Sequence, residues 1–206
     1  MRRERAAAAF GIALLLGTGA AGAAIPAPPT LAEFRRGGFV IFFRHAATDP
    51  ATADRDRADL GDCERQGILS EAGRADARTI GDAFRTLAIP VGEVRSSPWC
   101  RCLETARLAF GRADGEPLLA SIHGATGDEA LKARLVAALK EMLARPPAPG
   151  TNTVIVGHGF NLAGAARVPL AQGEAAIFRP KGVDGFQLVG KVGPREWLAL
   201  KGEAAR

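Results

Sequence analysis

Two short apolar segments, FVIFF at residues 39–43 and TVIV at residues 153–156, constrain the fold of this chain more than any other feature. The first is bounded by Gly37-Gly38 and by charged residues. Uninterrupted apolar runs of this length are typical of strands that are buried on both faces. Because such strands belong to sheets covered by helices on both sides, the sequence predicts an α/β fold.

Helical and strand patterns alternate along the chain, which favours a three-layer sandwich with a mainly parallel central sheet. We expect helices at residues 70–87, 97–110, 128–144 and 160–167. We expect further strands at residues 94–97, 174–178, 186–192 and 196–200. The last three strands are close enough in sequence to pair antiparallel. Ser70, Ser97 and Asp128 are suited to cap three of the helices at their N-termini. Residues 47–67 are rich in Asp, Arg and Gly and predict a long loop.

The N-terminal segment has the pattern of a secretory signal peptide. Three arginines precede an almost uninterrupted run of small and apolar residues, Ala6 to Gly17, and more small residues follow. A membrane anchor and a buried helix are the alternatives, but the apolar stretch is too short and too rich in Ala and Gly for a membrane span of about 20 residues. We therefore expect a periplasmic or secreted protein with no stable membrane anchor after cleavage. The expected parts are a signal peptide at 1–24, a linker at 25–37 and a single domain at 38–206.

The charge of the expected mature chain argues against a nucleic-acid partner. Cleavage after residue 24 removes three Arg and one Glu, which leaves 24 basic and 21 acidic residues and a net charge of +3. The positive charge is not gathered into a Lys/Arg run, and the chain has no Tyr, so aromatic residues for stacking on bases are few. A small anionic molecule is the expected partner.

The chain has three cysteines, Cys63, Cys100 and Cys102, and an exported protein meets an oxidising compartment. One disulfide and one remaining thiol are compatible with this number. A bond between Cys63 and Cys100 would tie the 47–67 loop to the 97–110 helix, but the sequence leaves this pairing open. The Cys-x-Cys spacing without a second Cys or His cluster is a poor zinc site, so we expect no metal.

Two histidines stand just after the two buried segments. His45 follows FVIFFR and His158 follows TVIVG. Ligand sites of open α/β sheets lie beyond the carboxyl ends of the strands, so both imidazoles are expected at one edge if the strands are parallel neighbours. Two unrelated structural histidines are the alternative, which the adjacent Arg44 makes less attractive. Arg101 falls in the first turn of an expected helix, where free N–H groups favour an anion. The guanidinium groups of Arg44 and Arg101 match phosphoryl oxygens, so this set predicts a phosphate pocket.

Three segments resemble the motifs of the histidine phosphatase (phosphoglycerate mutase-like) superfamily. FFRHAAT resembles its Arg-His-x-x-Thr signature, SSPWCRCLETA resembles its Ser-Ser-Pro-x-x-Arg-x-x-x-Thr-Ala segment, and VGHGFNL resembles its second-histidine segment. The segments occur in the order and at the separations typical of that family, between about Phe39 and Phe178. This ordered set makes the resemblance specific.

The resemblance implies that His45 is the nucleophile and becomes transiently phosphorylated. It also implies that Arg44, Arg101 and His158 bind and polarise the phosphoryl oxygens, and that Thr48 helps to hold the first loop at the substrate. A neutral imidazole is available at neutral pH, which suits covalent catalysis. Guanidinium groups in position meet the charge of the transferring phosphoryl group, so we expect neither a metal nor another cofactor.

No motif identifies the acid that protonates the leaving group. We prefer Glu174, because it begins a strand that, if antiparallel to residues 153–156, starts at the ligand edge. An ordinary solvated glutamate is the alternative for this position. The other candidates are Asp114, Glu116, Asp128 and Glu129. Asn161 is expected either to support substrate binding in the pocket or to cap the short helix.

Together these features predict an exported, metal-independent phosphomonoesterase that acts on a small phosphorylated substrate. A phosphoglycerate-mutase-type phosphotransferase is one alternative, which export argues against. A non-catalytic phosphate-binding module is another, which the complete set of site residues argues against. Specificity is expected in residues 47–67 and 112–127, where no motif identifies the ester. His123 is expected at the surface, with a place at the mouth of the pocket as the alternative. Trp99 and Trp197 are expected to be packing residues.

Overall fold

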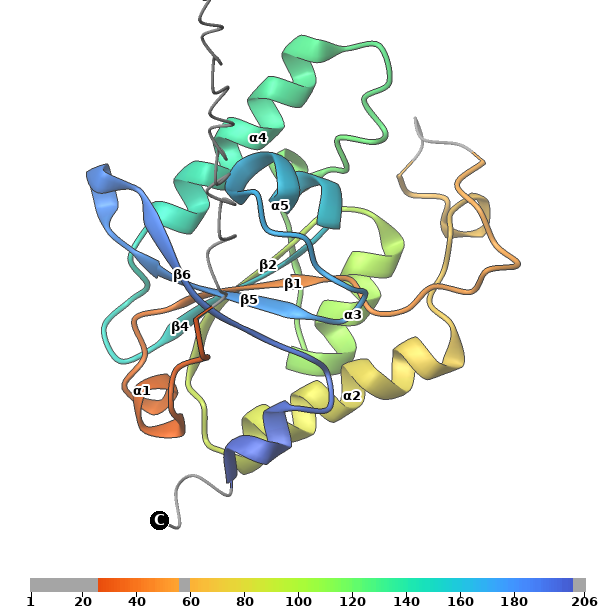
Figure 1. Ribbon diagram of the computed structural model, residues 1–206. Coiled ribbons are helices and arrows are strands. Elements are labelled where there is room, and N and C mark those ends of the chain that lie inside the picture. Colours follow the sequence, from red (N-terminus) through yellow and green to blue (C-terminus); the bar gives the residue numbers. More distant parts are fainter. Residues whose placement is uncertain (1–25, 56–59, 202–206) are drawn as a thin grey trace, which may run out of the picture.

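Residues 26–55 and 60–201 are described by the computed structural model, and the expected signal peptide lies outside them. The described chain forms a six-stranded sheet with helices on both faces (Figure 1). Its strands are β1 (Val40–Arg44), β2 (Val91–Ser96), β3 (Asp114–Gly115), β4 (Asn152–Gly157), β5 (Ala175–Pro180) and β6 (Phe186–Val192). The order is β3-β2-β4-β1-β5-β6, with β1 to β4 parallel and β5 antiparallel to both of its neighbours. The prediction of a mainly parallel sheet with antiparallel C-terminal strands is therefore confirmed.

Helices form the two outer layers. The α-helices are α1 (Leu31–Arg36), α2 (Glu71–Thr86), α3 (Cys100–Phe110), α4 (Glu129–Ala144) and α5 (Gly159–Ala166). The 3-10 helices are η1 (Cys63–Arg65), η2 (Pro117–Leu119), η3 (Gly182–Asp184) and η4 (Trp197–Lys201). The helices α4 and α5 cover one face of the sheet, and α1, α2, α3 and η4 cover the other (Figure 1). No helix in the described part of the chain is long and apolar enough to cross a membrane.

Strand β1 lies at the centre of both cores. Ile41 and Phe43 pack into the cluster on the α2 and α3 side, whereas Val40 and Phe42 pack into the cluster on the α4 and α5 side. All four side chains are almost completely buried. Successive side chains of a strand point to opposite faces, so a strand between two helical layers needs apolar residues at every position. This explains why the FVIFF segment shows no polar alternation.

The predicted caps of the two longest helices are present. The side chain of Ser70 accepts a hydrogen bond from the backbone N–H of Gly73 at the start of α2. The side chain of Asp128 accepts one from the N–H of Leu131 at the start of α4. Each cap satisfies a backbone donor that the helix itself leaves without a partner.

Helix α1 lies within the segment that we expected to be a linker. Thr30 and Glu33 form a capping box, and Leu31 and Phe34 are buried in the core. The ring of Phe34 packs against that of Trp197, with 5.4 Å between the ring centroids. The linker prediction for residues 25–37 is wrong in this part, because six residues are too few to show a helical period and three nearby prolines indicated a spacer.

The expected strand at residues 196–200 is also wrong, because this segment forms η4. Trp197 and Leu200 are both buried and pack into the same cluster. Residues three apart lie on one side of a helical turn but on opposite faces of a strand, so burial of this pair on one side requires the helical conformation.

Candidate active site

The two strand-end histidines lie together at the carboxyl edge of the sheet. Arg44 is in register with Gly157 in the parallel β1–β4 pair, so His45 and His158 follow at equivalent positions. The N–H of His45 donates to the carbonyl of Gly157 at 3.0 Å. The two imidazole ring centroids are 5.6 Å apart. The structure thus brings both rings to one edge, as the strand pattern predicted.

A cavity of about 230 Å³ opens at this edge. Five of the predicted site residues line it: Arg44, His45, Thr48, Arg101 and His158. The rest of its lining comes from the loop after β1, from the segment before α4, from the start of α5 and from Gln172. The cavity therefore collects side chains from positions 44 to 172 of the chain.

His45 is buried and oriented through its Nδ1 atom, which lies 2.9 Å from the carbonyl oxygen of Ala46. Because a carbonyl only accepts, this contact requires the proton on Nδ1 and leaves the lone pair of a neutral ring on Nε2. The pKa of His45 is lowered from 6.5 to about 4, chiefly by burial, with Arg101 and Arg44 acting in the same direction and the Ala46 carbonyl and Asp54 opposing the shift. The ring is therefore neutral at pH 7.

His158 is held by the second motif segment. Its Nε2 lies 2.8 Å from the hydroxyl of Ser97 and 3.6 Å from the sulfur of Cys102. Burial lowers the pKa of His158 well below its usual value, and His45, Arg101 and Arg44 lower it further. Ser97 was expected to cap the 97–110 helix, but α3 begins at Cys100 without a side-chain cap. The Ser97 hydroxyl contacts the histidine instead.

Arg44 lies beside the N-terminus of α5. Its Nη1 donates to the carbonyl of Leu170 at 2.8 Å, while its buried Nε has no hydrogen-bond partner within the described chain. A Cβ atom at Gly159 would lie 3.2 Å from Cδ and 3.4 Å from Nε of Arg44. Only glycine therefore leaves ordinary room for this guanidinium at the cavity. A buried donor without a partner is costly, which makes Nε a candidate contact for an anion.

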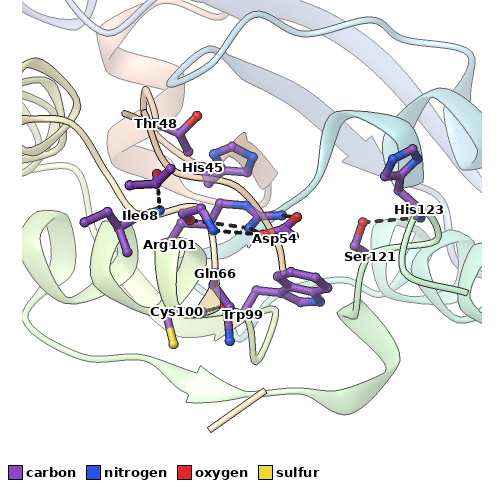
Figure 2. A network of polar contacts seen from close by, with 12 residues as sticks. His45, Thr48, Asp54, Gln66, Ile68, Trp99, Cys100, Arg101, Ser121 and His123 are labelled. Carbon is purple, nitrogen blue, oxygen red and sulfur yellow. Dashed lines mark hydrogen bonds and ion pairs between the residues drawn. The ribbon is translucent and has the colours of Figure 1, made fainter. Parts of the chain in front are cut away.

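Arg101 is the second guanidinium of the cavity and is buried. Its Nη1 lies 2.8 Å from Oδ1 of Asp54 and its Nη2 lies 3.4 Å from Oδ2, so the carboxylate meets the guanidinium with both oxygens. The guanidinium carbon lies 4.5 Å from the ring centroid of Trp99, which packs against it. Figure 2 shows the Arg101–Asp54 pair between His45 and Trp99. Asp54 thus engages Arg101 as the oxygens of a phosphoryl group would.

The loop that carries Asp54 is tied to the start of α3. A disulfide joins Cys63 to Cys100, so the pairing that the sequence left open is present. The side-chain carbonyl of Gln66 accepts from the N–H of Cys100 at 2.9 Å, and Asp54 accepts from the N–H of Gly67 at 2.9 Å. The third cysteine, Cys102, is a buried free thiol whose pKa burial raises to about 12.

Two further polar side chains position the loop after β1. The Thr48 hydroxyl accepts from Nε2 of Gln172 at 3.0 Å, and the Thr105 hydroxyl accepts from the N–H of Ala46 at 3.1 Å. Thr48 lines the cavity, as the resemblance implied, and its partner Gln172 lies beside it there. Gln172 was not predicted, because an amide in an expected loop carries no sequence signal.

Glu174 does not line the cavity. Its carboxylate pairs with Lys191 at 2.7 Å and accepts from the N–H of Ala171 at 2.8 Å. The chain path was predicted correctly, since β5 begins beside the end of β1 and the Glu174 carbonyl accepts from the N–H of Arg44. The side chain follows the two-residue period of β5 and faces Lys191, which pairs with Ala176. The assignment of Glu174 as the acid therefore lacks support from the structure.

The other acidic candidates also lie outside the cavity lining. Asp128 caps α4, Glu129 pairs with Lys132, Glu116 caps η2, and Asp114 belongs to the edge strand β3. Among the described residues that line the cavity, Asp54 is the one carboxylic acid. The sequence did not distinguish Asp54 from the other charged residues of a long loop.

Asn161 acts at a distance from the cavity. Its Nδ2 donates to the carbonyl of Ala120 at 2.8 Å, and its Oδ1 accepts from the N–H of Ile122 at 3.1 Å. The expectation of direct substrate binding by Asn161 is therefore replaced by a positioning role for residues 120–122. His123 is exposed at the surface, as expected, and it also lines the cavity.

The geometry defines an α/β protein with a cavity, lined by two guanidinium groups, at the carboxyl edge of the parallel strands. No group of three or more His, Cys, Asp or Glu residues within residues 26–55 and 60–201 is placed to hold a metal ion. The cavity combines a neutral, oriented imidazole with two guanidinium groups and a carboxylate. Such a set can bind an oxyanion and supply a nitrogen nucleophile beside it.

The sequence profile of the "Histidine phosphatase superfamily (branch 1)" matches residues 40–122. This range contains the first two motif segments, and the resemblance to that superfamily is confirmed there. No curated protein sequence matches the chain significantly.

Solved structures are similar to this chain in fold. A mycobacterial glucosyl-3-phosphoglycerate phosphatase, in complex with inorganic phosphate, is 15% identical, with 77% of this chain and 99% of that chain covered and a TM-score of 0.52. The protein TTHB049 from Thermus thermophilus is 18% identical, with coverages of 75% and 99% and a TM-score of 0.51. The three-layer α/β architecture is therefore that of histidine phosphatase structures.

Proposed function

We propose that this protein is an exported, metal-independent phosphomonoesterase that transfers the phosphoryl group of a small ester to His45. The observation that carries the proposal is the orientation of His45, whose Nδ1 proton is directed at the Ala46 carbonyl. This leaves the lone pair on Nε2, in a ring whose lowered pKa keeps it unprotonated. The guanidinium groups of Arg44 and Arg101 line the same cavity and supply charge for the phosphoryl oxygens.

The reaction proceeds in two displacements. Nε2 of His45 attacks phosphorus, the bond from phosphorus to the ester oxygen breaks, and that oxygen leaves with a proton from an acid. Water then attacks the phosphorylated imidazole, its proton passes to the carboxylate of the same acid, and the N–P bond breaks to release inorganic phosphate. The two arginines and the buried His158 stabilise the charge on the phosphoryl oxygens in both displacements.

Asp54 replaces Glu174 as the proposed acid. Its carboxylate lines the cavity and holds Arg101 at 2.8 Å. A phosphoryl dianion that binds Arg101 competes for this guanidinium and brings negative charge beside Asp54. A protonated carboxyl group at this place can give its proton to the leaving oxygen.

Export remains part of the proposal. It is based on the pattern of residues 1–24, and the Cys63–Cys100 disulfide is compatible with an oxidising compartment. A small phosphorylated substrate suits a cavity of about 230 Å³, which accommodates a phosphoryl group and a modest alcohol.

The test is an assay of the purified protein without residues 1–24 against a panel of phosphate monoesters, with and without EDTA. We expect release of inorganic phosphate at rates that the chelator leaves unchanged. Binding of phosphate without turnover of any ester would indicate a binding module instead. Transfer to an acceptor without release of phosphate would indicate a phosphotransferase.

A further inference from the structure

A second cavity adjoins the cavity lined by Arg44, His45, Arg101 and His158, which we call the phosphate cavity. It has a volume of about 350 Å³ and is lined by Ile122, His123, Thr126, Lys132 and Phe160. His123 and Phe160 also line the phosphate cavity, so these two rings form the boundary between the cavities. A group that is esterified to a bound phosphate and extends toward α5 therefore meets both rings.

Phe160 is unusual among the large apolar side chains of this protein. It is 63% exposed, whereas Leu162 in the same helix is completely buried. It stands two residues after His158, in the first turn of α5. A phenyl ring at the mouth of a charged cavity contributes little to the core, and covering it with an apolar partner is favourable.

The position of His123 beside Phe160 is fixed by contacts within the fold. Its imidazole is stacked on the Phe160 ring, with 5.4 Å between the centroids and 17° between the planes. The backbone N–H of His123 donates to the hydroxyl of Ser121 at 3.3 Å, a bond that is drawn in Figure 2. Asn161 holds the preceding residues on both sides through Ala120 and Ile122. The stacked pair is therefore a preformed aromatic surface.

The charge of the second cavity also restricts its ligand. Lys132 is the one lysine among the described residues that line it, and its Nζ atom pairs with Glu129 at 2.7 Å. This pairing offsets the positive charge, so a second phosphate on the substrate gains little there. A neutral, flat and partly apolar group fits the lining better.

We infer that the second cavity is the leaving-group subsite and that it takes a planar aromatic or heteroaromatic ring. The inference is based on the proposed function and specifies its substrate class, namely a monophosphate ester whose alcohol carries such a ring. The phosphoryl group binds between Arg44 and Arg101, and the ring packs against Phe160 and His123. Both aryl-type alcohols and nucleosides have this chemistry.

The experiment compares two pairs of esters that differ mainly in the ring. Benzyl phosphate is compared with butyl phosphate, and adenosine 5′-monophosphate with ribose 5-phosphate. Each pair releases a primary alcohol, so the need for an acid is matched within the pair. We expect at least one ring-bearing ester to have a kcat/KM about tenfold or more above its partner, as stacking on an aromatic side chain provides. The pair with the larger ratio distinguishes aryl-type alcohols from nucleosides.

Phe160→Ala tests whether the Phe160 ring forms part of the leaving-group subsite. We expect it to lower the ratio of kcat/KM for the ring-bearing ester to that for its partner without the ring about tenfold. Val183→Ala is the control, since it removes another exposed apolar side chain, in η3 between β5 and β6. This control should leave every ratio unchanged. Equal rates within both pairs, or a ring preference that persists in Phe160→Ala, would overturn the inference.

A binding measurement separates this inference from the proposed function. The dissociation constants of the same four esters are measured by calorimetry with His45→Ala, which lacks the proposed nucleophile. A ring preference in binding, lost on adding Phe160→Ala, supports the subsite even if no ester is hydrolysed by the wild type. Hydrolysis without any ring preference contradicts the subsite and leaves the phosphatase proposal intact.

Discussion

The carboxylate of Asp54 lies 2.8 Å from Nη1 of Arg101 and engages the guanidinium group that we assign to the phosphoryl oxygens. Both side chains line the cavity, and the Asp54 loop is held by the Cys63–Cys100 disulfide. The same carboxylate can therefore compete with an anion for Arg101 and deliver a proton to the leaving oxygen. These two roles make different, measurable predictions.

Asp54→Asn should lower kcat about 10²-fold or more on an alkyl phosphate and largely spare p-nitrophenyl phosphate, because a nitrophenolate leaves without a proton. The same change should tighten inhibition by inorganic phosphate several-fold, because the amide no longer competes as an anion for Arg101. Steady-state kinetics on both esters with phosphate as inhibitor provide both readouts.

Glu174→Gln is the matched comparison, since its carboxylate pairs with Lys191 outside the cavity lining. It should cause small and equal losses on the two esters. A large selective loss on the alkyl phosphate in Glu174→Gln, with none in Asp54→Asn, would restore the original assignment of the acid.

Gly159→Ala should reduce kcat/KM about tenfold or more without unfolding the protein. The added methyl group would lie 3.2 Å from Cδ of Arg44, so the guanidinium has to move from its position at the cavity. Gly115→Ala is the control, because a Cβ there would meet one atom of Leu103 at 4.0 Å. Thermal melts check folding of both variants. Wild-type kinetics in a folded Gly159→Ala protein would show that the close approach to Arg44 is not needed.

The buried imidazole of His45 predicts a pH dependence of stability. Its pKa in the folded protein is about 4, below the usual 6.5, so the unfolded chain binds more protons between these values. The unfolding free energy should therefore decrease as the pH falls from about 6.5 toward 4, by up to about 3 kcal/mol from this residue. His158 acts in the same direction.

Urea unfolding of the wild type and of His45→Asn at several pH values between about 4 and 8 measures this contribution. The variant should show a shallower dependence below about pH 6.5 and a similar one above it. Parallel curves for the two proteins would mean that His45 titrates normally in the folded state.

Much of the fold could be predicted because burial is visible in the local sequence. The FVIFF segment and the segment ending at Gly157 need apolar residues on both faces, and α2 and α4 carry polar caps and an apolar stripe. Helices α1 and η4 were not predicted because each is only about a turn or two long, so packing against the core determines their conformation.

The residues of the candidate site also fall into a group that the local sequence predicts and a group that it does not. The histidines and arginines stand at strand ends and a helix start, where the backbone alone fixes their positions. Asp54, Gln172 and His123 come from loops, and only long-range contacts bring them to the cavity. For Glu174, the strand order predicts the position of the backbone correctly, but the cross-strand neighbour Lys191 determines where the carboxylate points.

Trapping of the covalent intermediate tests the central claim most directly. A radiolabelled phosphate ester is mixed with the wild-type protein and quenched within milliseconds, and the labelled peptide is mapped by mass spectrometry. We predict a phosphoryl group on His45 that is labile to acid and stable to base, as a phosphoramidate is, and neither adduct nor turnover in His45→Ala. An active His45→Ala protein, or a base-labile adduct on another residue, would contradict the account.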